Sequence, residues 1–124
     1  MRRGIVSGTT LACLALWACE PVGPGEVEET ADIQESIARG GVLFLEYCAL
    51  CHGERGDGAG VRRGSLSRPP ANFRSPVFAP DRARVRSAIR DGIAGSDMPP
   101  WRRLGEQAVD DLTSYVLALA RSPR

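Results

Sequence analysis

The sequence predicts an all-α domain of three or four short helices joined by long loops. Apolar residues recur at spacings of three and four along three stretches, which is the period of a helix with one buried face. No stretch shows the alternation of apolar and polar residues that is typical of a strand. The segment 53–74 is rich in glycine, proline and arginine, a composition that predicts loop.

The first helix is expected to begin at Asp32, because Glu35 follows three residues later as in a capping box. It should run directly into Cys48. Its apolar positions, at helical spacing, are Ile33, Ile37, Gly40, Phe44 and Tyr47.

Two further helices are expected beyond the loop. Residues 81–90 predict a short helix that stops at Gly92. Residues 106–120 predict an amphipathic helix, and its apolar face carries Val109, Leu112, Val116 and Leu119. Loops this long are unusual in so small a domain, so we expect them to enclose a group that is not protein.

The first 18 residues resemble an export signal, with Arg2 and Arg3 ahead of an apolar run. That run is short for a bilayer span, which takes about 20 residues, although a retained membrane helix is the alternative. The segment LWAC at positions 16–19 resembles the lipobox of bacterial lipoproteins, in which Cys19 is lipidated. Ordinary cleavage nearby, leaving Cys19 as a free thiol or as a dimer-forming cysteine, is the other interpretation.

Residues 19–31 are expected to form a flexible acidic tether, and residues 32–124 to form the folded domain. The segment 20–35 holds six acidic residues and no basic one. Residues 36–124 hold fourteen arginines against nine acidic residues, which favours docking to an acidic protein surface or is simply a solvated exterior. The sequence thus predicts an exported protein on the periplasmic side of a bacterial membrane, anchored by lipid on Cys19.

The segment CALCHG at positions 48–53 carries the most specific signal. On a helical turn, Cys48, Cys51 and His52 share one face. Cys-x-x-Cys-His is the attachment signal of c-type haem. A thioredoxin-type pair would need a preceding strand, and a zinc site would need four ligands, whereas His52 is the sole histidine. The sequence therefore predicts one covalently bound haem c, with His52 as the proximal iron ligand.

A distal iron ligand follows by elimination. The usual donors are histidine, methionine, lysine and thiolate. Lysine is absent, the cysteines are committed, and Met1 leaves with the signal, so Met98 remains. Pro99 and Pro100 stiffen the backbone beside it. The alternative is that Met98 only fills a gap in the core.

Four motifs in order resemble class I, single-haem c-type cytochromes: CALCHGERGDGAG, RPPANF, AIRDGIAGSDMPPW and DDLTSYVLAL. The resemblance covers about residues 33–120. It implies a small cytochrome c-like fold wrapped around one haem, in which the first and last helices cross at a close contact. The matching positions are Gly40, Phe44 and Tyr115, which would otherwise be ordinary core residues.

The resemblance also implies residues that support the haem. A proline carbonyl is expected to accept a hydrogen bond from the ring of His52, and either Pro69 or Pro70 could provide it. The positions near the haem propionates are matched by Asn72 and Trp101, with Arg74 as an ion-pair partner. Simple packing or solvent exposure is the alternative for these three.

Ligation by both His52 and Met98 would leave no open position on the iron, which implies electron transfer between Fe(III) and Fe(II) rather than enzymatic catalysis. Redox proteins are the expected partners, and nucleic acid is not. One alternative is a fixed cytochrome subunit of a membrane respiratory or dehydrogenase complex. Another is a haem-based gas sensor or peroxidase-like protein with an open iron site.

Overall fold

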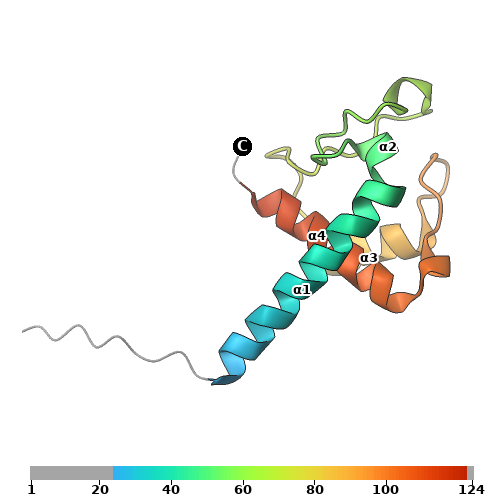
Figure 1. Cartoon of the computed structure of the whole chain (residues 1–124). Helices are drawn as coiled ribbons and strands as arrows, with labels where there is room; N and C mark the ends of the chain where they lie inside the picture. Colours follow the sequence, from blue (N-terminus) through green and yellow to red (C-terminus); the bar gives the residue numbers. More distant parts are fainter. Residues whose placement is uncertain (1–23, 123–124) are drawn as a thin grey trace, which may run out of the picture.

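The computed structural model describes residues 24–122, in which helices joined by loops are the regular secondary structure and no strand occurs (Figure 1). The elements are α1 Pro24–Tyr47, α2 Ala49–His52, the 3-10 helix η1 Arg63–Ser65, α3 Arg82–Asp91, the 3-10 helix η2 Arg102–Leu104 and α4 Glu106–Arg121. The prediction of an all-α domain with long loops is confirmed.

The two later helices lie where the sequence places them. The side chain of Asp81 caps α3 by accepting a hydrogen bond from the backbone N–H of Arg84 at 3.1 Å. The helix stops at Gly92, whose φ of 73° is in the left-handed region that favours glycine. Helix α4 runs to Arg121, one residue beyond the expected end.

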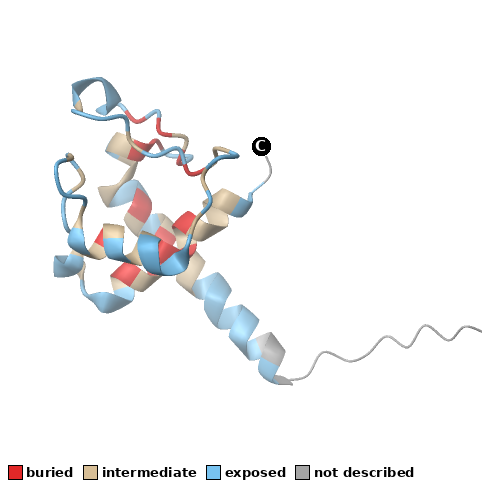
Figure 2. Ribbon diagram, turned by 180° about the vertical axis from the view of Figure 1, so that it is seen from behind, coloured by how far each residue is buried: buried red, intermediate tan, exposed pale blue. Residues whose placement is uncertain are grey.

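Helix α1 begins earlier than predicted. It starts at Pro24 rather than Asp32, so the part of the expected tether at 24–31 is helical. Proline is favoured in a first helical turn, where its missing N–H is not needed. The lack of an apolar period there did not exclude a helix: this part of α1 extends away from the other helices, and those of its residues whose burial is described are exposed (Figure 2).

The export signal, Cys19 and the remainder of the tether lie outside the described residues. Within residues 24–122, no helix combines the length and the apolar character that crossing a membrane requires.

Helices α1 and α4 cross where α1 has no side chain. Gly40 is buried, and a Cβ at this position would overlap the carbonyl oxygen of Asp111 and lie 2.9 Å from Cβ of Tyr115. One turn further along α1, the ring of Phe44 is 1% exposed and its centroid lies 5.2 Å from that of Tyr115. The structure therefore brings Gly40, Phe44 and Tyr115 together, as the resemblance implied.

A buried carboxylate adds a polar connection beside this crossing. Asp111 is 2% exposed and accepts hydrogen bonds from Arg39 Nε at 2.8 Å and Nη2 at 3.1 Å. Ser36 Oγ donates to the same carboxylate at 2.7 Å, and Gln107 Nε2 does so at 3.0 Å. The hydrogen bonds from Arg39 lower the pKa of Asp111 in spite of its burial, so the group is ionised at neutral pH.

The apolar core is small. Its buried members are Phe44, Phe73, Ile89, Val109, Leu112 and Val116. They come from α1, α3, α4 and the long loop, because Phe73 lies between α2 and α3 in the chain. The outer side of α3 is joined to α4 by ion pairs of Arg86 with Asp110 and Glu106, both at 2.6 Å.

Replacing Gly40 by alanine tests the crossing. In an unconstrained helix this change stabilises by about 1 kcal/mol, but here the new Cβ would overlap backbone, and overpacking costs about 1–3 kcal/mol. We expect a net fall in the free energy of unfolding of the holoprotein, measured with denaturant. Gly64→Ala is the control, since a Cβ there meets nothing within 4 Å. A Gly40→Ala variant as stable as the parent would contradict this account of the crossing.

Replacing Asp111 by asparagine tests the buried carboxylate. Its folded pKa lies below the value of about 3.9 for an unfolded aspartate, so its stabilisation is full above that pH and is lost as the pH falls through the folded pKa. We expect the variant to lose roughly 1–3 kcal/mol at pH 7, because buried donors lose a charged acceptor. The difference should shrink below about pH 4.

Unfolding of the holoprotein in urea at pH 7 and at pH 3 measures this difference. Asp110→Asn is a matched control on the same helix, because Asp110 has a more exposed side chain and forms an ion pair with Arg86. A difference between parent and Asp111→Asn that is the same at both pH values would contradict the assigned role.

Candidate functional site

The cysteine motif continues the helical turn at the end of α1. The backbone N–H of Cys48 donates to the carbonyl of Phe44 at 2.8 Å, and that of His52 donates to the carbonyl of Cys48 at 2.9 Å. These bonds keep the spacing of an α-helix from α1 into α2, so Cys48, Cys51 and His52 share one face, as predicted. Both cysteines are half-buried free thiols, and His52 is buried.

The His52 ring is held by a backbone group and by an aromatic ring. Its Nδ1–H donates to the carbonyl oxygen of Ala71 at 3.1 Å. The ring of Phe73 stacks on it, with centroids 4.7 Å apart and planes 21° apart. Burial lowers the pKa of His52, and the hydrogen bond to Ala71 offsets this only in part. The imidazole is therefore neutral at pH 7, and its Nε2 lone pair remains for a metal.

The expectation that Pro69 or Pro70 would supply this carbonyl is wrong by one position. The Pro70 carbonyl instead lies 2.9 Å from where a Cβ of Gly58 would be, so it packs against the loop that follows the motif. A backbone acceptor has no side-chain signature, so the sequence indicated the segment but not the residue. Phe73 was also missed as a partner of the His52 ring, although its aromatic side chain three residues after Pro70 was the available signal.

The cysteines are unsuited to thiol–disulfide exchange. Burial, with a smaller contribution from Cys51, raises the pKa of Cys48 to about 12. In a thioredoxin-type motif the first cysteine acts as a thiolate and has a lowered pKa. Cys48 stands at that first position and is a protonated thiol at neutral pH. A thioether in its place has no proton to lose, so burial at this position carries no such electrostatic cost.

The loop after the motif folds back against it. The N–H of Gly58 donates to the His52 carbonyl at 2.8 Å, and that of Gly60 donates to the Cys51 carbonyl at 3.2 Å. A Cβ at Gly60 would overlap the carbonyls of Leu50 and Cys51, so only glycine allows this approach. The motif is thus fixed from two sides, by α1 and by the returning loop.

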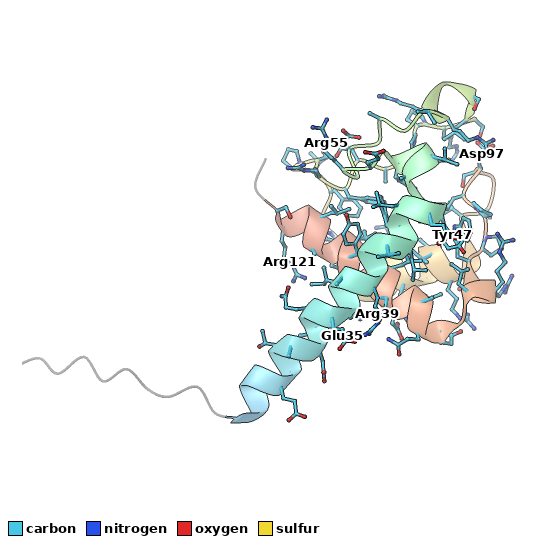
Figure 3. All side chains as sticks on the ribbon, in the orientation of Figure 1. Glu35, Arg39, Tyr47, Arg55, Asp97 and Arg121 are labelled. Atoms are coloured by element: carbon cyan, nitrogen blue, oxygen red, sulfur yellow. The ribbon has the colours of Figure 1, made fainter. Side chains whose placement is uncertain are left out.

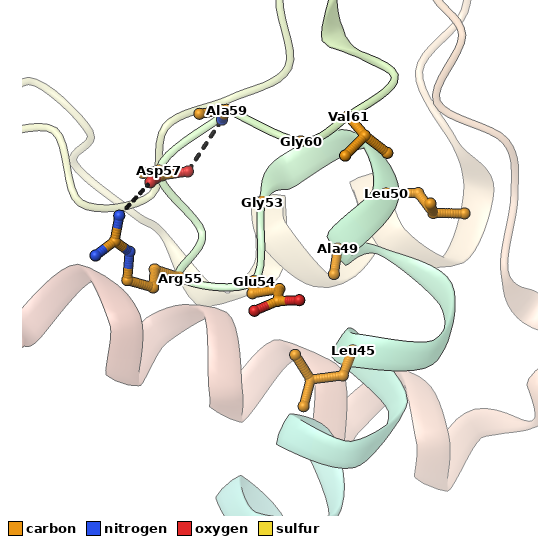
Figure 4. A pocket seen from close by; sticks show the side chains of 10 residues that line it. All are labelled: Leu45, Ala49, Leu50, Gly53, Glu54, Arg55, Asp57, Ala59, Gly60 and Val61. Carbon is orange, nitrogen blue, oxygen red and sulfur yellow. Dashed lines mark hydrogen bonds and ion pairs between the residues drawn. The ribbon is translucent and has the colours of Figure 1, made fainter.

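A surface hollow lies on the outer side of this turn, between the end of α1, α2 and the returning loop (Figure 4). It contains none of the three motif side chains; its walls include Leu45, Leu50 and Val61. These three are 55%, 55% and 86% exposed, which leaves an apolar surface directly beside the attachment turn.

Met98 lies on the loop between α3 and η2 and is half-buried. Its N–H donates to Ser96 Oγ at 3.2 Å, and its carbonyl accepts from the N–H of Ile93 at 3.1 Å. The ring of Trp101 packs against that of Tyr47, with centroids 5.4 Å apart. Since Tyr47 directly precedes Cys48, this contact brings the Met98 loop to the end of α1 that carries the motif.

The Met98 loop also meets the loop on the histidine side. Asp97 Oδ2 accepts a hydrogen bond from the N–H of Ser67 at 2.7 Å and another from the Ser67 hydroxyl. These bonds lower the pKa of Asp97, which is therefore ionised at neutral pH. Figure 3 shows Asp97 on the loop that reaches toward the segment after η1. Neither residue was singled out from the sequence.

Asn72 and Trp101 have structural partners that the sequence did not reveal. The side-chain oxygen of Asn72 accepts from the N–H of Arg74 at 2.9 Å, which shapes the turn after Ala71. Trp101 stacks beneath the guanidinium of Arg103, 5.0 Å from the ring centroid, in a cation–π contact. Roles of Asn72, Trp101 and Arg74 toward haem propionates stay predictions.

The donor set fits a covalently bound haem c. Two thiols on one helical face match attachment along one porphyrin edge, and the neutral, fixed imidazole of His52 matches an iron ligand. Within residues 24–122, no group of three or more histidine, cysteine, aspartate or glutamate side chains is placed to hold a metal ion, so the zinc interpretation has no site there. The all-α fold and this turn together define a c-type cytochrome domain.

Comparison with known proteins agrees. Residues 35–116 match the family described as cytochrome c oxidase, cbb3-type, subunit III, and the chain belongs to this family of c-type cytochrome domains. It is 32% identical over 84 residues to the Cbb3-type cytochrome c oxidase subunit CcoP of Azospirillum sp. (strain B510), a match that covers 64% of this chain and 27% of that protein. The corresponding subunit of Azospirillum brasilense is 32% identical over 79 residues, with 63% and 26% covered.

A solved structure is also similar. A chain of the reducing HAO-like protein complex of Kuenenia stuttgartiensis superimposes with a TM-score of 0.59 and 28% identity, over 65% of this chain and 41% of that one. The chain described here spans about a quarter of the length of the curated relatives it matches. The fold and the covalently bound haem c predicted from the sequence are thereby confirmed, and the protein is an electron-transfer cytochrome.

Proposed function

We propose that this cytochrome is an electron carrier with no catalytic activity of its own. Its single haem would be bound through Cys48 and Cys51, and the iron would be ligated by His52 and Met98. When bound, the haem supplies one-electron exchange between Fe(III) and Fe(II). The observation that carries the proposal is the neutral, buried His52 ring, oriented by Ala71 and Phe73 on the same turn as two free thiols.

The chain's own residues would keep this centre dry and rigid. Phe44, Phe73 and Phe78 form successive edge contacts at 6.1 and 5.3 Å beside His52, which excludes water from the histidine side. The prolines after Met98 hold an extended backbone, so a thioether ligand is presented with little loss of conformational freedom. A methionine ligand favours the ferrous state, which raises the reduction potential.

We further propose that the carrier works as a subunit of a membrane respiratory complex rather than as a free shuttle. Its curated relatives are named as subunits of a cbb3-type cytochrome c oxidase. The exposed apolar side chains of Leu45, Leu50 and Val61 beside the attachment turn suit a protein–protein contact. Arg62 and Arg63 follow Val61 in the chain and add positive charge at the edge of this surface, whereas the hollow itself is also lined by Glu54, Arg55 and Asp57.

The proposed location is the periplasmic side of a bacterial membrane, with export directed by residues 1–18 and a lipid on Cys19. The support is the sequence pattern alone: a short apolar run behind two arginines and a lipobox-like LWAC. A lipid anchor and a place in a membrane complex are compatible, since both confine the domain to the same surface.

Ligation by Met98 is tested with the Met98→Ala variant. We expect the ferric parent to show the weak sulfur-to-iron charge-transfer band and the ferrous parent to exclude carbon monoxide. The variant should lose the band and bind carbon monoxide rapidly, because one axial position has lost its ligand. Ser65→Ala is the control, since its hydroxyl donates locally to the carbonyl of Arg62 and not to the Met98 loop. Rapid carbon monoxide binding by the parent would instead favour a gas-binding or peroxidase-like protein.

Membership of a complex is tested by purification from native membranes. After mild detergent extraction, the affinity-tagged full-length chain should retain integral membrane subunits of an oxidase. Replacing Cys19 by serine should release the chain into the soluble fraction if the lipid is the main anchor. Recovery of the parent alone, as a soluble monomer, would contradict both the complex and the anchor.

A further inference from the structure

Two loops that hold different parts of the haem site are joined by one short side chain from each. Asp97 Oδ2 accepts from both the N–H and the hydroxyl of Ser67, although the two residues are thirty positions apart. We call this pair of hydrogen bonds the Ser67–Asp97 latch.

Each end of the latch lies close in sequence to a residue of the haem site. Ser67 stands four residues before Ala71, whose carbonyl fixes the His52 ring. Asp97 directly precedes Met98. The latch therefore joins the segment that orients the histidine to the segment that carries the methionine.

The latch is linked to both parts of the site over short stretches of chain: a proline pair separates Ser67 from Ala71, and Asp97 is bonded directly to Met98. Pro69 and Pro70 lie between Ser67 and Ala71, while Pro99 and Pro100 follow Met98. Proline fixes φ near −65°, so a movement at one end of such a segment is transmitted rather than absorbed. A shift of the loop at Asp97 would thus displace Met98 with it.

The hydrogen bonds of Met98 itself shape its loop without fixing where the loop lies. Its N–H and carbonyl bond to Ser96 and Ile93, which belong to the same short segment. The segment is attached to the fold at its far end, where the Trp101 N–H donates to the carbonyl of Ile89 at 2.9 Å. The latch adds a second attachment at the other side of Met98.

Exposed polar contacts usually contribute little, because ordering two long side chains costs entropy. The entropy cost of forming the latch is smaller, because the side chains of serine and aspartate are short and one of the two donors is a backbone N–H. It resembles a helix cap, in which a carboxylate accepts backbone N–H groups, more than a surface ion pair.

We propose that Ser67 and Asp97 are positioning residues that hold the Met98 loop against the histidine-side segment and so keep Met98 on the iron. This inference rests on the proposed ligation by His52 and Met98. Opening the latch would raise the fraction of time in which the Met98 position is free, without altering the attachment turn.

The test uses the full-length ferric holoprotein and imidazole as an added ligand, which binds only when Met98 leaves. The readouts are the rate of imidazole binding and the loss of the sulfur-to-iron band.

Loss of one hydrogen bond changes the equilibrium between bound and released Met98 by about two- to tenfold. We expect a rate increase of about threefold in Ser67→Ala, which keeps the backbone donor, and of about tenfold or more in Asp97→Ala. Asp97→Asn, which keeps an acceptor oxygen, should lie between the parent and Asp97→Ala.

Ser65→Ala is the matched control. Ser65 ends η1, two residues before Ser67, and its hydroxyl donates locally to the carbonyl of Arg62 at 2.9 Å, so its loss should leave imidazole binding unchanged. Thermal unfolding of each holoprotein separates positioning from general destabilisation, because the latch variants should melt close to the control. Should Asp97→Ala fail to fold, the milder Ser67→Ala decides the matter.

Imidazole rates in Ser67→Ala and Asp97→Ala within the error of the control would overturn the latch while leaving the proposed function intact. A parent that lacks the sulfur-to-iron band, or in which Met98→Ala leaves the band unchanged, would overturn the proposed ligation and the latch together.

Discussion

The close crossing of α1 and α4 at Gly40 is the constraint on which the rest of the structure depends. With no side chain at this position, α1 approaches the backbone of α4 at Asp111, and the rings of Phe44 and Tyr115 then fill the space one turn further along. The buried Asp111 carboxylate, held by Arg39 and Ser36, closes the other side. A small core permits little freedom elsewhere, so the position of α1 determines where Cys48 can be.

From this crossing the site is built mainly by backbone hydrogen bonds. Helix α1 passes its hydrogen-bond pattern into α2, and the loop that follows returns to the carbonyls of Cys51 and His52. The histidine is oriented by another backbone group, the Ala71 carbonyl. Backbone hydrogen bonds need no particular side chain at the donor or the acceptor. They do need glycine where two backbone segments approach closely, as at Gly60.

This construction explains what the sequence could and could not predict. Periodicity located α3 and α4 within a residue because each has a buried face, and the Cys-x-x-Cys-His spacing identified the attachment turn because its meaning is local. The start of α1 was misplaced, since its first turns form a helix without burying a face. The acceptor for His52 was placed at Pro69 or Pro70 rather than Ala71, because a carbonyl leaves no mark on the sequence. The contact of Ser67 with Asp97 joins two loops thirty residues apart, and no local pattern encodes it.

The length of α1 sets the distance between its first residues and the haem attachment turn. Its 24 residues, at 1.5 Å per residue, extend about 35 Å from Pro24 to Tyr47. An anchor that precedes Pro24 would therefore attach at one end of a rigid rod, and the haem turn would lie at the other. The first turns of α1 extend away from the other helices (Figures 1 and 2). The acidic residues there, Glu28, Glu29 and Asp32, are unfavourable next to an anionic lipid surface. With the proposed anchor, these charges would disfavour α1 lying along the lipid surface, and its length would hold the attachment turn away from lipid. The exposed apolar surface around Leu50 would then be accessible to a protein partner.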